Sequence, residues 1–154
     1  MNMSDHDLPL VSIITPSFNQ APFLEETIQS VLKQDYPRIE YIIVDGGSAD
    51  GSVSIIKKYA DKLAWWVSEV DQGQADAINK GWKRCSGDIL AWINADDSYC
   101  PEAIRAVMEI FVERDDVVLV SGAANTVDVH GQTILFTKRS PDIDPYAMLK
   151  RSRG

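Results

Sequence analysis

Short apolar runs alternate along this chain with stretches in which apolar residues recur every three or four positions. The runs are rich in Val and Ile, which predicts strands buried on both faces of a sheet. The longer stretches predict helices with one apolar face, and two of them begin at a proline, which suits a first helical position. The expected strands are 10–15, 39–44, 64–67, 89–93 and 117–120, and the expected helices start at or just after Pro22, Gly51, Gln74 and Pro101. In the third helix, Ala75, Ile78 and Trp82 are expected to face the sheet.

The pattern changes after the fifth run. Residues 123–129 and 132–137 flank His130 and Gly131, which predicts a hairpin rather than another helical crossover. Five strands alternating with four helices predict an α/β fold, an open, mainly parallel twisted sheet with helices on both faces. Ligands of such sheets bind beyond the carboxyl ends of the strands, so the chemistry is expected in the loops that follow them.

Length and charge narrow the class of protein. The 154 residues suit one domain, expected at 9–138, with a disordered arm at 1–8. Asp and Glu outnumber Lys and Arg by 23 to 15, giving a net charge of −8, which argues against a nucleic-acid partner. An acidic protein that binds a phosphorylated ligand needs a divalent cation such as Mg²⁺ or Mn²⁺ between the two.

The hydrophobicity pattern predicts neither a membrane-spanning helix nor a signal peptide. No apolar run approaches the roughly 20 residues of a membrane-spanning helix, and the first seven residues do not resemble a signal peptide. Cys85 and Cys100 lack the spacing of a zinc site and suit buried thiols in a reducing compartment. We therefore expect a cytoplasmic protein, with the inner face of the membrane as a second place where it would work.

The loop after the first strand contains Pro16, Phe18 and Asn19. A proline ring and an aromatic ring at a strand end suit a flat nucleobase, and Asn19 offers both hydrogen-bonding senses. The alternative is that Asn19 caps the next helix and Phe18 packs in the core.

The loop after the second strand begins with Asp45 and is followed by Gly46, Gly47 and Gly51. Such glycine density lets the backbone approach a ligand closely. The alternative is a simple turn, in which Asp45 bonds its own backbone.

The third cluster lies where the third helix starts. Gly73 stands at a helix N-terminus, where N–H groups can meet a phosphate, and Asp76 lies one turn inside the helix on the same face as Asn79. The alternative has Asp71 as an N-cap and Asp76 in an ion pair with Lys80.

The fourth strand is followed by Asp96 and Asp97. Adjacent carboxylates repel each other, and a cation bound between them removes that cost. Mg²⁺ commonly takes one or two carboxylates and completes its shell with water and phosphate oxygens. The alternative is that both residues only shape the turn before Pro101.

Four ordered motifs between about Leu10 and Gly131 resemble the large family 2 of inverting glycosyltransferases, which have the GT-A fold. The motifs are 11–19 (VSIITPSFN), 45–52 (DGGSADGS), 71–81 (DQGQADAINKG) and 94–97 (NADD). The resemblance implies transfer of a sugar from a nucleotide donor, a UDP-sugar, to the hydroxyl of a saccharide or lipid-linked saccharide. It also implies a divalent metal and a place in cell-surface polysaccharide biosynthesis.

The resemblance further implies roles for single residues. Pro16 and Phe18 would flank the base, and Asp45 would help hold the nucleoside. Asp76 would lie beside the base or ribose. Asp96 would reach the ribose, and Asp97 would ligate the metal, with Asp96 as the second metal residue.

Two departures from the family pattern stand out. Gly46 stands where many relatives have a second acidic residue. Relatives also continue for about a hundred further residues, which contain the catalytic base and the acceptor-binding surface. We therefore expect a C-terminally truncated domain in which 139–154 is a tail or the start of the acceptor region. Asp128 and His130 are interpreted as parts of the hairpin turn, and no catalytic base is assigned.

Three other functional classes share some of these sequence features. A module that binds a nucleotide sugar without turning it over remains open, because no base is identified. A phosphoacceptor signalling domain needs a lysine at a later strand end, where this chain has Ser121 and Gly122. A dinucleotide-binding dehydrogenase needs a G-x-G-x-x-G motif after the first strand, which is missing.

Overall fold

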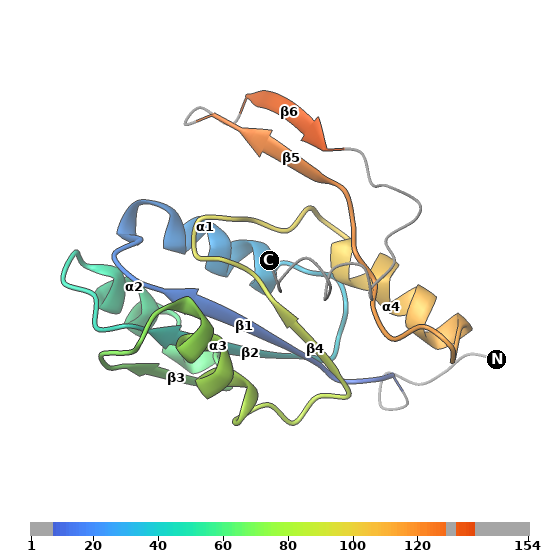
Figure 1. Cartoon of the computed structure of the whole chain (residues 1–154), viewed down its shortest axis with the longest axis horizontal. Coiled ribbons are helices and arrows are strands. Elements are labelled where there is room, and N and C mark those ends of the chain that lie inside the picture. Colours follow the sequence, from blue (N-terminus) through green and yellow to red (C-terminus); the bar gives the residue numbers. More distant parts are fainter. Residues whose placement is uncertain (1–7, 129–131, 138–154) are drawn as a thin grey trace, which may run out of the picture. The chain divides into compact units, whose positions relative to one another are not determined.

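The computed structural model describes residues 8–128 and 132–137, in two compact units, Met1–Glu113 and Arg114–Gly154 (Figure 1). The predicted arm, apart from Leu8, and the predicted tail at 139–154 lie outside the described residues, as do His130 and Gly131 of the predicted hairpin turn.

The first unit is built on a four-stranded parallel sheet in the order β3-β2-β1-β4. The strands are β1 (Val11–Ser17), β2 (Ile39–Asp45), β3 (Trp65–Ser68) and β4 (Ile89–Trp92). Every residue of β1 is buried, because this strand has a neighbour on each side and helices over each face. The predicted parallel sheet is confirmed for these four strands.

Helices cover both faces of the sheet, as predicted. They are α1 (Ala21–Leu32), α2 (Ser52–Lys58), the short 3₁₀ helix η2 (Ala60–Lys62), α3 (Gln74–Trp82) and α4 (Ala103–Glu113). On one face, side chains of α1, α2 and α4 form a single core with Ile13 and Ile43 of the sheet. On the other face, Ala77 of α3 packs on Ile14, Ile42 and Val44.

The predicted inner stripe of α3 was wrong. Ala77 and Gly81 are the buried residues, whereas Ala75 is exposed and Trp82 is 40% exposed. A Cβ on Gly81 would lie 2.8 Å from Cγ2 of Ile14, so the helix lies too close to the sheet for a larger residue there. Small residues, rather than large apolar ones, make this contact.

The fifth predicted strand is also wrong. Residues 117–120 form no strand, and Val118 and Leu119 are 88% and 60% exposed. A strand needs a hydrogen-bonded neighbour, and apolar composition alone does not supply one. The second unit instead contains the antiparallel pair β5 (Ala124–Val127) and β6 (Thr133–Thr137), which confirms the predicted hairpin. Asp128 accepts a hydrogen bond from the N–H of Gln132 at 2.9 Å, which closes this pair.

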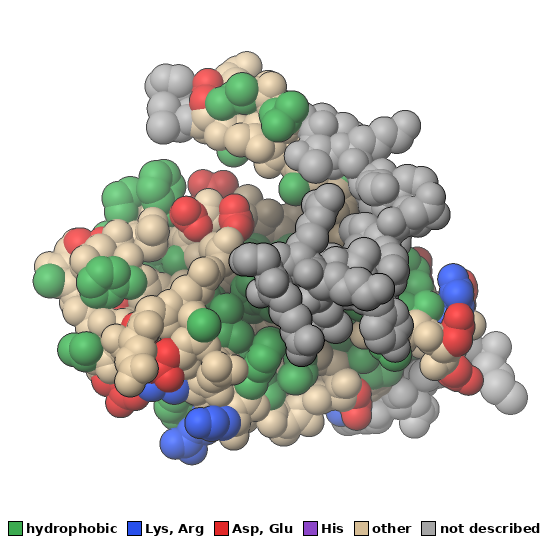
Figure 2. Space-filling view, in the orientation of Figure 1, with side chains coloured by type: hydrophobic (Ala, Val, Ile, Leu, Met, Phe, Trp, Pro, Cys, Tyr) green, Lys and Arg blue, Asp and Glu red, His purple; other side chains and the backbone are tan. Residues whose placement is uncertain are grey.

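Strand β4 forms one edge of the parallel sheet in the described part of the chain. Ile89 and Ala91 pack on the core beneath α1, while Leu90 and Trp92, on the opposite face, are 50% and 54% exposed. The Trp92 ring meets Trp82 of α3 edge to face, with centroids 6.4 Å apart. Figure 2 shows apolar side chains exposed around this part of the surface.

No helix within the described residues is long and apolar enough to cross a membrane. Both cysteines are free thiols. Cys85 is half-buried, whereas Cys100 is exposed, so the prediction of two buried thiols was wrong for Cys100.

Candidate functional site

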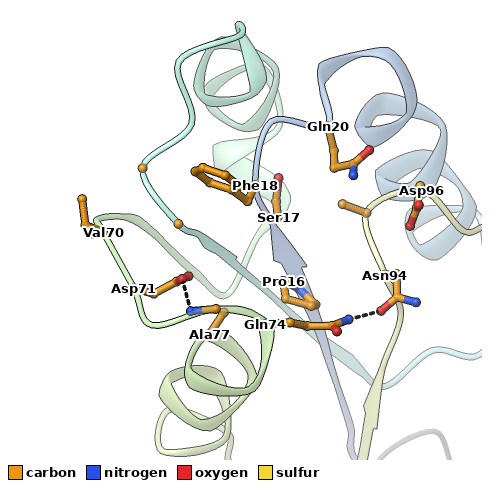
Figure 3. Close-up of a pocket in the computed structure, with 14 residues that line it drawn as sticks. Pro16, Ser17, Phe18, Gln20, Val70, Asp71, Gln74, Ala77, Asn94 and Asp96 are labelled. Atoms are coloured by element: carbon orange, nitrogen blue, oxygen red, sulfur yellow. Dashed lines mark hydrogen bonds between the residues drawn. The ribbon is translucent and has the colours of Figure 1, made fainter.

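A cavity of about 690 Å³ opens at the carboxyl edge of the parallel sheet, where the predicted clusters were expected (Figure 3). Loops after all four strands contribute to its wall. The lining residues are Pro16, Ser17, Phe18, Gln20, Gly46, Gly47, Val70, Asp71, Gly73, Gln74, Ala77, Asn94, Ala95 and Asp96. The structure thus brings Pro16, Phe18, Gly73 and Asp96 of the predicted set into one pocket.

Phe18 supplies the aromatic surface of this pocket. Its side chain is 61% exposed, which rules out the alternative that it packs in the core. Asn19 turns away from the cavity: its Oδ1 accepts from the N–H of Ala49 at 3.0 Å, and its own N–H donates to Ser48 Oγ at 2.8 Å. Asn19 does not cap α1 either, because the N-cap position belongs to Gln20. Its left-handed φ of 52° is one that asparagine tolerates.

Asp45 is completely buried and does not line the cavity. Its carboxylate accepts from the N–H of Gly47 at 3.2 Å and of Ser48 at 2.9 Å. The hydroxyls of Ser48 and Ser68 donate to it at 2.5 and 2.7 Å. In this structure Asp45 holds the turn on which Gly46 and Gly47 reach the pocket, which corresponds to the alternative weighed for it.

The same loop supports the start of α1. Asp50 accepts from the N–H of Ala21 at 2.8 Å, and Ser52 Oγ accepts from the N–H of Gln20 at 3.2 Å. These acceptors replace the missing N-cap side chain of α1. The hydrogen bond from the Ser52 hydroxyl, followed by that from Ala21, lowers the pKa of Asp50. The loops after β1 and β2 are thereby tied together as one wall of the pocket.

The loop between β3 and α3 forms the opposite wall. Gly73 has a φ of 105°, in the region that favours glycine, and its N–H donates to Asp71 Oδ1 at 2.7 Å (Figure 3). Asp71 therefore braces the start of α3 without being its N-cap, which is Gly73. Asp71 also lies against Gly46, where a Cβ would come within 2.8 Å of Asp71 Oδ2.

Asp76 does not line the cavity. It accepts from the N–H of Gln72 at 3.1 Å and forms the expected ion pair with Lys80 at 3.5 Å. The hydrogen bond from Gln72 lowers the pKa of its carboxyl, burial opposes this to a smaller extent, and the charge of Lys80 adds a still smaller lowering.

The loop after β4 places Asp96 in the cavity wall and Asp97 beside it. Asn94 links this loop to α3: its Oδ1 accepts from Gln74 Nε2 at 2.5 Å, and its Nδ2 donates to Asp97 Oδ2 at 2.9 Å. The buried hydroxyl of Thr27 donates to the carbonyl oxygens of Ala95 and Asp97 at 2.9 and 2.7 Å. The backbone here is fixed from α1, and the Asp97 side chain is held by Asn94.

Ser17 contributes an unusual group to the wall. In the described part of the chain, Ser17 Oγ is the one buried side-chain polar atom that has no hydrogen-bond partner. An unsatisfied buried hydroxyl costs about 1–3 kcal/mol, so a partner supplied by a ligand or by water would be favourable.

A divalent cation fits the loop after β4. Asp96 and Asp97 are both exposed, and within the described residues neither forms an ion pair with a lysine or arginine. Among those residues there is no cluster of three or more acidic, His or Cys side chains of the kind that encloses a metal. A site with two carboxylates suits Mg²⁺ or Mn²⁺ that takes its remaining ligands from water and phosphate.

Sequence reasoning missed several lining residues, among them Gln20, Gln74 and Asn94. Gly46 lines the cavity, as its place in the glycine-rich loop predicts, whereas Asp71 was expected only as a possible N-cap. Each lies within four residues of a predicted site residue, so nearness to a strand end was the available signal. Which side chain of a loop faces inward depends on backbone angles that spacing does not reveal.

Comparisons with known proteins identify the family of this chain. The model of the family described as Glycosyl transferase family 2 matches residues 12–147. An uncharacterized glycosyltransferase of Rickettsia typhi is 36% identical over 84% of this chain and 41% of its own length. A putative teichuronic acid biosynthesis glycosyltransferase of Bacillus subtilis is 37% identical over 69% of this chain and 43% of its own. The chain thus spans about two fifths of the length of these relatives.

Solved structures show the same fold. The mannosyltransferase from Pyrobaculum calidifontis, in complex with GDP-Man and Mn²⁺, matches with a TM-score of 0.62 and 31% identity over 78% of this chain and 36% of its own. TarS of S. aureus matches with a TM-score of 0.62 and 28% identity over 68% of this chain and 20% of its own. The fold is therefore that of the GT-A glycosyltransferases. On the family match across most of its length, this chain belongs to glycosyl transferase family 2.

Proposed function

We propose that this chain forms the donor-binding part of a metal-dependent, inverting glycosyltransferase that uses a UDP-sugar. The observation that carries the proposal is the cavity at the carboxyl edge of the sheet. It combines an exposed aromatic ring, a helix N-terminus and the Asp96 carboxylate, which forms no ion pair within the described residues; a nucleoside diphosphate and its cation need such groups.

Different residues of the cavity wall suit the base and the phosphates of the donor. Phe18 and Pro16 offer flat surfaces to the base, and Ser17 Oγ offers a free hydrogen-bonding group nearby. Gly46, Gly47 and Gly73 bring backbone close to the ligand, since none of them carries a side chain that would fill the cavity. The N–H groups at the start of α3 suit a phosphate or a sugar hydroxyl.

Asp96 and Asp97 would hold the divalent cation on the diphosphate. Such an ion acts as a Lewis acid that offsets the negative charge building on the departing nucleoside diphosphate. The residues of this chain would bind and orient the donor, and an acceptor hydroxyl would attack its anomeric carbon. Asp45 acts in this scheme through the turn that it holds and not through ligand contact.

Isothermal titration of UDP in Mn²⁺ and in EDTA tests the proposal. We expect UDP to bind with Mn²⁺ and to bind far more weakly in EDTA. Asp97→Ala should reduce this difference sharply without removing it, because it takes away one of the two carboxylates and leaves Asp96. Asp61→Ala, an exposed carboxylate in η2 that lies outside the cavity, is the matched control and should bind as the unchanged chain does.

The choice of nucleotide requires a second comparison, because the related mannosyltransferase was solved with GDP-Man. Titration of GDP under the same conditions should give weaker binding than UDP if the donor is a UDP-sugar. No binding of either nucleotide with Mn²⁺ would contradict the proposal.

Product analysis with donor and acceptor then separates a transferase from a module that only binds. Binding that depends on Asp97, in the absence of any transfer, would favour the binding module. The acceptor that we propose is a saccharide or lipid-linked saccharide of the cell surface, in line with the name of the Bacillus subtilis relative.

A further inference from the structure

A chain of hydrogen bonds joins the two walls of the cavity. Gln74, the first residue of α3, donates to Asn94 Oδ1 at 2.5 Å, and Asn94 donates to Asp97 Oδ2 at 2.9 Å. Figure 3 shows the first of these bonds crossing from α3 to the loop after β4. Gln74 and Asn94 both line the cavity, whereas Asp97 lies just outside its wall.

The amide of Asn94 suits this place for a chemical reason. It presents an acceptor to Gln74 and a donor to Asp97 at the same time, which no carboxylate or amine can do. A donor on Asp97 Oδ2 leaves the other oxygen without a partner in the described part of the chain. The Asp97 backbone is fixed by Thr27 and by its N–H bond to the Asn94 carbonyl oxygen at 3.2 Å, both of which a side-chain substitution at Asn94 leaves in place. The Asn94 amide therefore sets only the orientation of the Asp97 side chain.

We propose that Gln74 and Asn94 are positioning residues that orient the Asp97 carboxylate for the divalent cation, and this rests on the proposed function above. Groups that hydrogen-bond a metal ligand fix its orientation, and their removal typically costs about 10-fold or more in metal affinity. Because Gln74 begins the helix beneath the donor, this hydrogen-bond chain couples the donor side of the pocket to the cation side.

The readout is the ratio of the UDP dissociation constant in EDTA to that in Mn²⁺, measured by titration calorimetry. Loss of a direct contact to UDP changes both constants equally and leaves the ratio unaltered. Loss of cation orientation lowers the ratio. We expect Asn94→Ala to reduce it about 10-fold, and Gln74→Ala to reduce it less, because the bond from Asn94 to Asp97 survives.

Two further variants make the test specific. Gln72→Ala removes an exposed side chain of the same kind from the same loop, outside the cavity, and should leave the ratio unchanged. If Asn94 acts through Asp97, adding Asn94→Ala to Asp97→Ala should cause no additional loss. Circular dichroism and urea unfolding of each variant establish that it is folded.

The outcomes separate this inference from the proposed function. An unchanged ratio in Asn94→Ala, alongside Mn²⁺-dependent UDP binding by the parent chain, overturns the positioning role alone. A further loss when Asn94→Ala is added to Asp97→Ala does the same. Absence of Mn²⁺-dependent binding in the parent chain overturns both.

Discussion

The two ends of the parallel sheet carry similar polar residues but use them differently. At the amino end, Glu40 accepts from the N–H and the hydroxyl of Ser86 at 2.8 and 2.7 Å and from the hydroxyl of Ser12. At the carboxyl end, Asp96 and Asp97 retain carboxylate oxygens without partners in the described part of the chain, and Ser17 Oγ has none. Polar groups that the protein satisfies hold the fold, and those it leaves open are available to a ligand.

Asp45 shows that a carboxylate at the carboxyl edge can have its hydrogen-bonding capacity filled by the protein itself. It lies at that edge, yet the protein satisfies it completely. Solvent exposure and unfilled hydrogen-bonding capacity therefore separate the two roles better than position does. The following predictions test this distinction.

The largest effect is expected from Asp45→Ala. It leaves four part-buried donor groups without their acceptor, so the free energy of unfolding should fall by about 3 kcal/mol. Asp96→Ala, at an exposed position, should change it by less than about 0.5 kcal/mol. Urea unfolding of both variants measures the difference, and equal losses would contradict the distinction.

The second-largest effect is expected from replacing a glycine by alanine, with a larger loss of stability at the amino end of the sheet than at the carboxyl end. A Cβ on Gly87 would lie 2.7 Å from the backbone nitrogen of Ser12 and 2.8 Å from the carbonyl oxygen of Leu10, neither of which can move easily. Gly87→Ala should cost about 1–3 kcal/mol. A Cβ on Gly46 meets only the movable carboxylate of Asp71, so Gly46→Ala should cost less. Thermal unfolding of the two variants measures the losses. A larger loss in Gly46→Ala than in Gly87→Ala would contradict a rigid amino end.

The amino end should also show a pH dependence. Burial raises the pKa of Glu40, but hydrogen bonds from Ser12, Ser86 and Gly87 outweigh it and hold the pKa below the usual 4.5. A lowered folded-state pKa contributes stability that is present above the unfolded pKa and lost as pH falls through the folded one. Glu40→Gln should therefore lose less unfolding free energy than the parent between about pH 5 and pH 3. Identical slopes in urea titrations across that range would rule this out.

The smallest effect is expected from Ser17→Ala. Removing a buried hydroxyl that has no partner should leave stability unchanged or raise it by up to about 1 kcal/mol. Thr15→Val is the matched comparison two residues earlier, where the hydroxyl bonds that of Tyr41 at 2.9 Å, and should cost about 1 kcal/mol. Urea unfolding of both distinguishes them, and a clear loss in Ser17→Ala would show that the hydroxyl has a partner in solution.

The sequence predicted the parts of the fold that depend on strong apolar patterns. The four parallel strands are apolar runs bounded by polar loops. Their positions in the sequence, and their alternation with helices along the chain, could therefore be predicted directly. The strand expected at 117–120 failed because a strand depends on a partner elsewhere in the chain. The inner face of α3 failed because Ala77 and Gly81 contact the sheet through their small size, which hydrophobicity scales do not register.

The site was predictable to the level of loops and not of side chains. Strand ends located the cavity, and Pro16, Phe18, Gly73 and Asp96 line it. Asn19 and Asp45 instead bond the loop after β2, because the local backbone turns them there. The bond between Gln74 and Asn94 joins positions 20 residues apart and could not be read from either motif.

The exposed apolar face of β4 affects how samples of this polypeptide should be handled. Within the described residues β4 is an edge strand whose Leu90 and Trp92 are about half exposed, which favours contact between molecules, and the effect grows with protein concentration. Calorimetry is therefore best done on dilute, freshly separated monomer, and light scattering before each titration would keep aggregation heat out of the measured enthalpies.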